Sequence, residues 1–314
     1  MSLLRFLHLD VFAATRGGGN HLGVVLGADA WDIEAMQRFA RWTGLVETTF
    51  VLPATQPRAS YRVRIFTPRR EIPFAGHPSV GSAHAALVCN LAAPVDGLLW
   101  QECAAGVLPL QVIGAGAQRC LLLRCPPARV VQTGADAHPL LAAALGGIGS
   151  GKLPPALVAG GRRWWLAEAA SAAALRAWQP DHAAIATLAR ATDSTGLCMF
   201  ARNAGADAEL VVRAFADGVG ITEDAASGAA NGLVAAYVAH SEPDGPLAHG
   251  YVVSQGREIG HDAAITVRMD AQGIWVGGCV NTIIDGRLDW DAAAGTTAEA
   301  IATTRDAPLK VAQA

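Results

Sequence analysis

The sequence predicts an α+β fold with antiparallel or mixed β-sheets. Strand-like apolar runs outnumber helical segments along the whole chain. The few helical segments do not alternate with the strands in the regular order of βαβ units. With 314 residues, 52% of them hydrophobic, the chain is long enough for one large domain or two domains with ample cores.

The first part of the chain contains one clear helix and several strand-like runs. Residues 32–44 have helical spacing and end at Gly44, as helices often do. Runs rich in aliphatic and aromatic residues, typical of strands, cover residues 5–13, 21–27, 47–53, 60–68, 108–114 and 119–125.

Residues 70–87, REIPFAGHPSVGSAHAAL, pass from the end of a strand into a helix. Pro78 suits the first helical position because it has no N–H to lose, and the small residues around it let other groups approach. The start of a helix offers unpaired N–H groups and a partial positive charge, which favour a carboxylate or a phosphate. The alternative is an ordinary turn with a surface histidine, because most helix starts bind only water.

The passage around residues 126–140, which begins PPARVVQTGADAHP, is the candidate crossover between two domains. We therefore assign an N-terminal domain to residues 1–128 and a C-terminal domain to residues 129–314, with the last residues as candidates to pack back onto the first domain. An Ala-rich helical segment is expected at 172–191, and a second helix is expected after residue 224. Strands are expected at 197–203, 209–216, 250–256, 263–270 and 274–280.

A weak internal repeat relates the two halves. VRIFTPRREIPFAGHPSVGSAHAAL and VVRAFADGVGITEDAASGAANGLVAAY both run from a strand with an R-x-F motif, through a loop, to a helix start rich in small residues. The motif is Arg64 and Phe66 in the first copy, and Arg213 and Phe215 in the second. If the halves face each other, the two helix starts would hold one anionic substrate between them.

Composition and charge exclude several classes of function. A net charge of −3 leaves no basic surface for nucleic acid or an anionic membrane. No run of about 18 apolar residues is present, and Arg5, His8 and Asp10 interrupt a short N-terminal apolar run, so we expect a soluble cytoplasmic protein. The six cysteines form no C-x-x-C motif and are expected to be reduced, buried thiols.

The sequence also favours a protein without a metal or an organic cofactor. GGGNHLG lacks the spacing of a dinucleotide-binding loop, and no G-K-[ST] follows it. His77 and His84 would share a helix face, but no third ligand accompanies them. No motif for nicotinamide, flavin or pyridoxal phosphate is present.

Five segments, in this order along the chain, resemble the phenazine-biosynthesis PhzF-like family: GNHLGVV, GLVETTFVLP, RIFTPRREIPFAGHPSVGSAHAAL, VRAFADGVGITEDAASGAANGLVAAYV and SQGREIG. The resemblance covers nearly the whole chain, and FAGHPSVG followed by EDAASGAA is its most specific part. It implies the fold of diaminopimelate epimerase, in which two similar domains each wrap a curved sheet around a central helix. It also implies a homodimer and a cofactor-free isomerisation in the cleft between the domains, best known from a dihydro-hydroxyanthranilate ring.

The resemblance assigns roles to particular residues. The Glu of its ET-F segment is the principal acid/base, assisted by the His of GHP and the Asp of ED, which correspond to Glu47, His77 and Asp224. The residues expected to contact a small carboxylate substrate are Asn20, Gly76, Ser79, Ser227, Gly228 and Ala229.

The chemistry of these residue types fits a proton shuttle. A carboxylate whose pKa is raised by an apolar setting can accept a proton at one carbon and return it at another, and Leu45, Val46 and Phe50 would supply that setting. Without the resemblance, Glu47 would be interpreted as a solvated loop carboxylate. Asp224 would be interpreted as a helix N-cap.

Three positions depart from the family pattern. Ala229 stands where many members have Ser, His21 follows Asn20 where Asn-Pro is usual, and His261 replaces a common Arg. These departures favour a substrate other than the phenazine intermediate.

Two alternatives compete with an isomerase. Related racemases and epimerases use one cysteine at each helix start, whereas this chain has His77 and Ser227 there, so a two-thiol racemase is disfavoured. A binding protein that has lost turnover is favoured by Ala229 and opposed by Glu47. We therefore expect a cofactor-independent isomerase or epimerase that acts on a small carboxylated metabolite.

Overall fold

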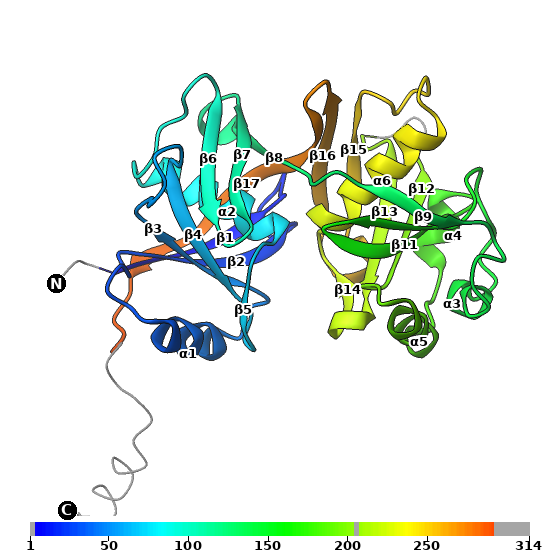
Figure 1. Ribbon diagram of the computed structural model, residues 1–314, viewed down its shortest axis with the longest axis horizontal. Helices are drawn as coiled ribbons and strands as arrows, with labels where there is room; N and C mark the ends of the chain where they lie inside the picture. The colour runs from blue at the N-terminus through cyan, green and yellow to red at the C-terminus, as the bar shows by residue number, and fades with distance from the viewer. Residues whose placement is uncertain (1–3, 204–206, 292–314) are drawn as a thin grey trace, which may run out of the picture.

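The computed structural model describes residues 4–203 and 207–291, which form two barrel-like lobes side by side (Figure 1). We call residues 4–124 together with residues 278–291 the first lobe, and residues 125–277 the second lobe. The residues of the predicted C-terminal domain beyond 291 lie outside the described part of the chain.

The first lobe is a closed barrel around a helix. Its strands pair in the order β1, β2, β3, β4, β6, β7, β8 and β17, and β17 pairs back with β1. The β2–β3 and β4–β6 pairs are parallel and need crossovers, which α1 and α2 provide. The elements are β1 (Arg5–Val11), β2 (Asn20–Leu26), α1 (Ile33–Thr43), β3 (Thr48–Leu52), β4 (Tyr61–Phe66), β5 (Glu71–Ile72), α2 (Gly76–Val88), β6 (Leu98–Cys103), β7 (Gly106–Ile113), a 3-10 turn (Gly116–Gln118), β8 (Cys120–Arg124) and β17 (Gly273–Arg287).

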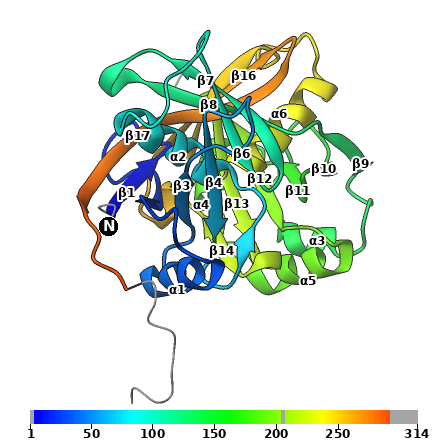
Figure 2. The same ribbon diagram turned by 60° about the vertical axis from the view of Figure 1, so that its left-hand side comes forward.

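The second lobe repeats this plan. Parallel pairs again lie beside crossovers: β11 with β12 across α4 and α5, and β13 with β15 across α6. The elements are β9 (Arg129–Thr133), α3 (Leu141–Leu145), β10 (Ala156–Gly160), β11 (Arg162–Glu168), α4 (Ala172–Ala177), α5 (His182–Thr192), β12 (Leu197–Arg202), β13 (Leu210–Ala216), a 3-10 turn (Asp217–Val219), β14 (Ile221–Asp224), α6 (Gly228–Ser241), β15 (Gly250–Gln255), a 3-10 turn (Arg257–Ile259) and β16 (Ala263–Asp270). Figures 1 and 2 show α1, α3 and α5 along one side of the molecule, outside the barrels.

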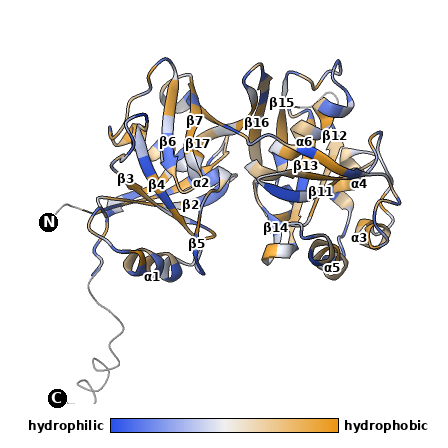
Figure 3. Cartoon of the chain, in the orientation of Figure 1, coloured by the Kyte–Doolittle hydropathy of each residue, from blue (hydrophilic) through white to orange (hydrophobic). Residues whose placement is uncertain are grey.

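Most residues of the central helices α2 and α6 are small or apolar and are buried, because strands surround these helices. A Cβ added to Gly81 of α2 would lie 2.4 Å from the side chain of Leu22, and one added to Gly232 of α6 would lie 2.6 Å from Sγ of Cys125. The outer helix α1 instead has one buried face, and Figure 3 shows hydrophobic and hydrophilic residues on its different sides.

Two segments carry the chain between the lobes. Residues 125–128 lead from β8 to β9, and β17 returns: its first residues pair with β16, and residues from Val280 onward pair with β1. The boundary at residue 128 stays a prediction, and it falls in the first of these segments.

The Ala-rich segment at 172–191 forms two helices rather than one. Trp178-Gln179-Pro180 separates α4 from α5, since proline cannot continue a helix from its preceding turn. Ser171 and Asp181 then cap the two helices through their side chains.

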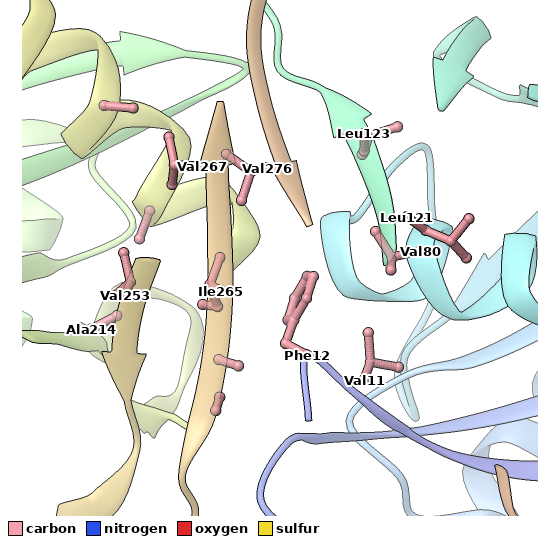
Figure 4. Close-up of a cluster of buried hydrophobic side chains, with 14 of the residues drawn as sticks. Val11, Phe12, Val80, Leu121, Leu123, Ala214, Val253, Ile265, Val267 and Val276 are labelled. Atoms are coloured by element: carbon pink, nitrogen blue, oxygen red, sulfur yellow. The ribbon is translucent and has the colours of Figure 1, made fainter. Parts of the chain in front are cut away.

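One apolar core runs through both barrels. Figure 4 shows Phe12 between Val80 and Leu121 of the first lobe and Ile265 and Val253 of the second. Phe12 is 1% exposed, and its φ of 64° is unusual for a residue with a side chain.

The predicted α+β fold, with a curved mixed sheet around a central helix in each half, is confirmed. Within the described residues, no helix is both long and apolar enough to cross a membrane.

Candidate active site

The two central helices begin at the same place, between the lobes. A Cβ built on Gly76, the first residue of α2, would lie 3.5 Å from Cα of Gly228, the first residue of α6. Gly76, Gly228 and Ala229 are each partly exposed, so backbone groups of both helix starts face solvent. The structure thus brings together the two small-residue helix starts of the internal repeat.

Glu47 precedes β3 and reaches this meeting point. Its Oε2 lies 3.5 Å from Nε2 of His77 and has no hydrogen-bond partner among the described residues. Burial, and next the negative charge of Asp224, raise the pKa of Glu47 to about 8, while the positive charge of Arg162 partly opposes this. At neutral pH this carboxyl is therefore mostly protonated.

Two apolar sequence neighbours of Glu47 have different surroundings. Val46 is 44% exposed, and Phe50 packs instead against Phe39 and Trp31 under α1. That Leu45, Val46 and Phe50 supply the apolar setting of Glu47 stays a prediction.

His77 lies in the first turn of α2. Its Nε2 is 3.2 Å from the carbonyl oxygen of His21, and burial lowers the pKa of His77 to about 4. The imidazole is therefore neutral at pH 7, and its contact with Glu47 joins two uncharged groups rather than an ion pair. A neutral imidazole whose Nε2–H donates to the His21 carbonyl is held in a fixed orientation.

Asp224, at the end of β14, is held across the lobes by Asn20. The amide nitrogen of Asn20 donates to Oδ1 of Asp224 at 2.9 Å and to the carbonyl oxygen of Ala226 at 3.1 Å. Burial raises the pKa of Asp224, although hydrogen bonds from Ser227, Ala226 and Asn20 and the nearby His261 act in the opposite direction. Asn20 is thus placed to position Asp224.

A glycine-rich loop brings Asn20 into place. The carboxylate of Asp10 accepts hydrogen bonds from the backbone N–H groups of Gly17 and Gly19. A Cβ on Gly19 would lie 2.2 Å from the carbonyl oxygen of Val11, so only glycine fits there. His261 of the second lobe contacts the carbonyl oxygen of Gly19 through Nδ1 at 2.7 Å.

Two residues that were predicted to contact the substrate, Ser79 and Ser227, form hydrogen bonds within the protein. Ser79 is fully buried, and its hydroxyl donates to the carbonyl oxygen of Ala75 and accepts from the amide of Gln101. Ser227 is the N-cap of α6, and its hydroxyl accepts from the N–H of Ala230 at 3.4 Å. Asn20, Gly76, Gly228 and Ala229 lie at the meeting point of the helices.

Sequence reasoning missed several supporting residues. Gln255 accepts from the backbone N–H of Ser227 and donates to the carbonyl oxygen of Asp224, which fixes the turn into α6. Its only sequence signal is its place in the SQGREIG segment. Arg162, whose positive charge lowers the pKa of Glu47, belongs to no motif that the sequence analysis identified.

The arrangement suits proton transfer next to a bound anion. Glu47 can take up or give up a proton near neutral pH, and the helix starts offer N–H groups to a carboxylate. Among the described residues, no three His, Cys, Asp or Glu side chains gather closely enough to hold a metal ion.

Comparisons with known proteins show which family the chain resembles. Residues 9–286 match the family model described as phenazine biosynthesis-like protein. The chain is 34% identical over 272 residues to the trans-2,3-dihydro-3-hydroxyanthranilate isomerase of Pseudomonas aeruginosa, covering 86% of this chain and 91% of the relative. It is 31% identical to antisense-enhancing sequence 1 of Schizosaccharomyces pombe, covering 90% of this chain and 97% of the relative.

Solved structures show the same fold. A PhzF-family phenazine biosynthesis protein of Bacillus anthracis superposes with a TM-score of 0.79 at 25% identity, covering 92% of this chain and all of that one. A hydroxyproline epimerase from Agrobacterium vitis superposes with a TM-score of 0.59 at 13% identity, covering 91% of this chain and 92% of that one, which shows a shared fold alone.

Proposed function

Because the chain belongs to the phenazine biosynthesis-like (PhzF) protein family, we propose that it is a cofactor-independent isomerase that moves a proton between carbons of a small carboxylated metabolite. Glu47 is its acid/base. The observation that carries this proposal is a carboxyl at the point where two helices begin: its buried Oε2 has no hydrogen-bond partner in the part of the chain that the structure describes, and its pKa is about 8.

One carboxyl can perform both halves of such a reaction. The ionised fraction of Glu47, roughly a tenth at pH 7, removes a proton from a carbon next to the activating group of the substrate. Burial favours the protonated acid that results, and this acid then delivers the proton to a second carbon. His77 and Asp224 surround the carboxyl, and we assign them to orientation and to tuning of its pKa.

The substrate carboxylate would bind at the two helix starts. The N-cap residue of α2 is Ala75, which has no side-chain acceptor for the N–H groups of the first turn. A carboxylate placed there gains those N–H groups and the favourable end of the helix dipole. Bound there, it would lie beside the carboxyl of Glu47.

The replacement Glu47→Gln tests the proposal. It keeps size and much of the hydrogen bonding but removes the basic site, so turnover and solvent deuterium incorporation should fall by about 10⁴-fold or more while binding persists. Trans-2,3-dihydro-3-hydroxyanthranilate and a set of cyclic amino-acid-like acids serve as probes in deuterium oxide. Glu34→Gln, in the first turn of α1, is the matched control and should behave as the wild type.

Other outcomes point elsewhere. Near-full turnover by Glu47→Gln together with loss in Asp224→Asn would reverse the roles and contradict the mechanism. Exchange at one carbon with inverted configuration would indicate a racemase or epimerase of an amino-acid-like acid. Binding without exchange in the wild type would indicate a non-catalytic binding protein.

We also propose that the reaction needs no metal, nicotinamide, flavin or pyridoxal phosphate, because the carboxyl of Glu47 itself titrates near neutral pH. Turnover should be unchanged after exhaustive treatment with EDTA and dialysis. Loss of activity that added metal restores would contradict this.

We further propose a homodimer. Trp42 on α1 is 69% exposed, and its ring packs against Trp290. Exposed aromatic surface is favoured in interfaces between chains. Light scattering should give twice the monomer mass at micromolar concentration, and a monomer mass would contradict the proposal.

A further inference from the structure

Two cysteines far apart in the sequence meet on adjacent strands of the first barrel. Sγ of Cys120, the first residue of β8, lies 2.9 Å from Sγ of Cys279 on β17, although the residues are 159 positions apart. The two residues are directly paired in the antiparallel β8–β17 ladder. Both residues are only partly buried.

The backbone at this pair suits a covalent bond between the sulfurs. The N–H of Cys125 donates to the carbonyl oxygen of Ile274 at 2.8 Å, and hydrogen-bonded rungs alternate with non-hydrogen-bonded rungs from there along the ladder. Cys120 and Cys279 therefore occupy a non-hydrogen-bonded rung, where Cα atoms lie about 4.5 Å apart and side chains are close. Disulfides span Cα separations of about 4.4–6.8 Å, so the rung already has the spacing that a disulfide needs.

We propose that Cys120 and Cys279 are a disulfide-forming pair that closes when the protein meets a small-molecule disulfide, such as oxidised glutathione. The thiolate of one cysteine attacks a sulfur of the oxidant, which forms a mixed disulfide and releases one small thiol. The thiolate of the second cysteine then attacks the protein sulfur of that mixed disulfide, which forms the Cys120–Cys279 bond and releases the second small thiol. Two protein thiols are oxidised, the oxidant is reduced to two thiols, and these carry away the two protons.

The two cysteines lie on the strands that continue into the second lobe. β8 continues through residues 125–128 into the second lobe, and β17 arrives from that lobe after pairing with β16. Cys279 is the last residue of β17 that pairs with β8 before the strand continues along β1. A bond at this rung therefore ties together the two strands that connect the lobes.

The pair stays reduced without an oxidant. Burial, and next the neighbouring Cys279, raise the pKa of the Cys120 thiol to about 12, which keeps its thiolate scarce. Closure is therefore slow compared with an activated redox cysteine, and it is limited by formation of the first mixed disulfide.

Mass spectrometry of the full-length protein tests the proposal. After incubation with oxidised glutathione at pH 8, the intact denatured mass should fall by the mass of two hydrogen atoms, and peptide mapping should join residue 120 to residue 279. Dithiothreitol should reverse the change. Cys120→Ser and Cys279→Ser should each abolish it, whereas Cys89→Ser, a change at another partly buried thiol, should leave it intact.

A second measurement keeps the result interpretable if a serine variant folds poorly. Because the bond closes a long loop, oxidised wild-type protein should melt several degrees above reduced wild-type protein, and Cys279→Ala should show no such difference. A stable glutathione adduct at either cysteine that never resolves, or a bond between other cysteines, would overturn the proposal.

Discussion

The two lobes share one arrangement of strands and helices, but their corresponding Arg–Glu ion pairs differ in how deeply they are buried. In the first lobe, Arg64 binds Glu71 through two hydrogen bonds of 2.8 Å, and the side chains are 27% and 28% exposed. In the second, Arg213 binds Glu223 through bonds of 2.9 and 2.8 Å, and the side chains are only 5% and 7% exposed. Each arginine also lies over the phenylalanine two residues later. The repeat in the sequence therefore corresponds to a repeated set of side-chain contacts: an Arg–Glu ion pair and an Arg–Phe contact in each lobe.

The helix starts differ in the same way. α2 begins after Ala75 and carries His77, whereas α6 begins after Ser227, whose side chain caps it. The first lobe thus supplies the titrating Glu47 and an open helix start, and the second supplies a capped, hydrogen-bonded frame around Asp224. An active site between two repeats can place its reactive groups on one lobe and its rigid support on the other.

The largest expected effect on stability comes from breaking the buried ion pair between Arg213 and Glu223. Arg213→Met leaves Glu223 and the carbonyl oxygens of Leu175 and Trp178 without their partner, so the free energy of unfolding should fall by about 3–5 kcal/mol. Arg64→Met, at the more exposed pair, should cost about 1 kcal/mol or less. Urea unfolding of both variants measures the contrast, and equal losses would contradict the comparison.

The next largest effect is the folding stability that is lost when the buried carboxyl of Glu47 ionises. The pKa of Glu47 in the folded protein, about 8, lies above the ordinary value of 4.5, so the folded state binds more protons between these values and stability falls as pH rises through that window. Glu47→Gln should therefore be more stable than the wild type by a few kcal/mol at pH 9 and nearly equal to it at pH 4.5. Urea unfolding at both pH values checks this, and a difference that does not change with pH would contradict it.

The smallest effect concerns the helix starts. Ser227→Ala removes the cap of α6 and should cost about 1 kcal/mol of stability. Ala75→Ser should instead add a cap to α2, gain stability of up to about 1 kcal/mol, and weaken substrate binding, because the new hydroxyl competes for the same N–H groups. Calorimetry of unfolding and of substrate binding measures both. Unchanged affinity in Ala75→Ser would show that the substrate does not use the start of α2.

The local structure could be predicted from sequence, and the environment of the site could not. The helical segment predicted at 32–44 appears as α1, with Gly44 as its C-cap at φ 66°. The helix predicted in GHPSVG is also present, but it begins at Gly76, so Pro78 is its third residue and not its first. These features depend on caps and turns that neighbouring residues determine.

Burial at the site depends on distant residues. His77 and Asp224, 30 and 177 positions from Glu47 in sequence, set its surroundings, and no neighbour-based argument contains that information. For the same reason the inward position of Ser79 could not be anticipated, since it depends on Gln101 of β6. Motif resemblance selected the candidate residues, and tertiary packing decides which of their side chains have partners within the protein.

The measurement that tests the central claim most directly is the titration of Glu47 itself. Carbon NMR of protein labelled at the glutamate carboxyl carbons, with Glu47→Gln to assign the signal, reports the ionisation of this one group between pH 3 and pH 10. The account predicts a midpoint near 8 in the wild type, displaced toward lower pH in Asp224→Asn, because the neighbouring negative charge that raises the pKa is removed. A midpoint near the ordinary value of 4.5 would contradict the account, because it would show that the surroundings of Glu47 do not favour the protonated acid that has to form during the reaction.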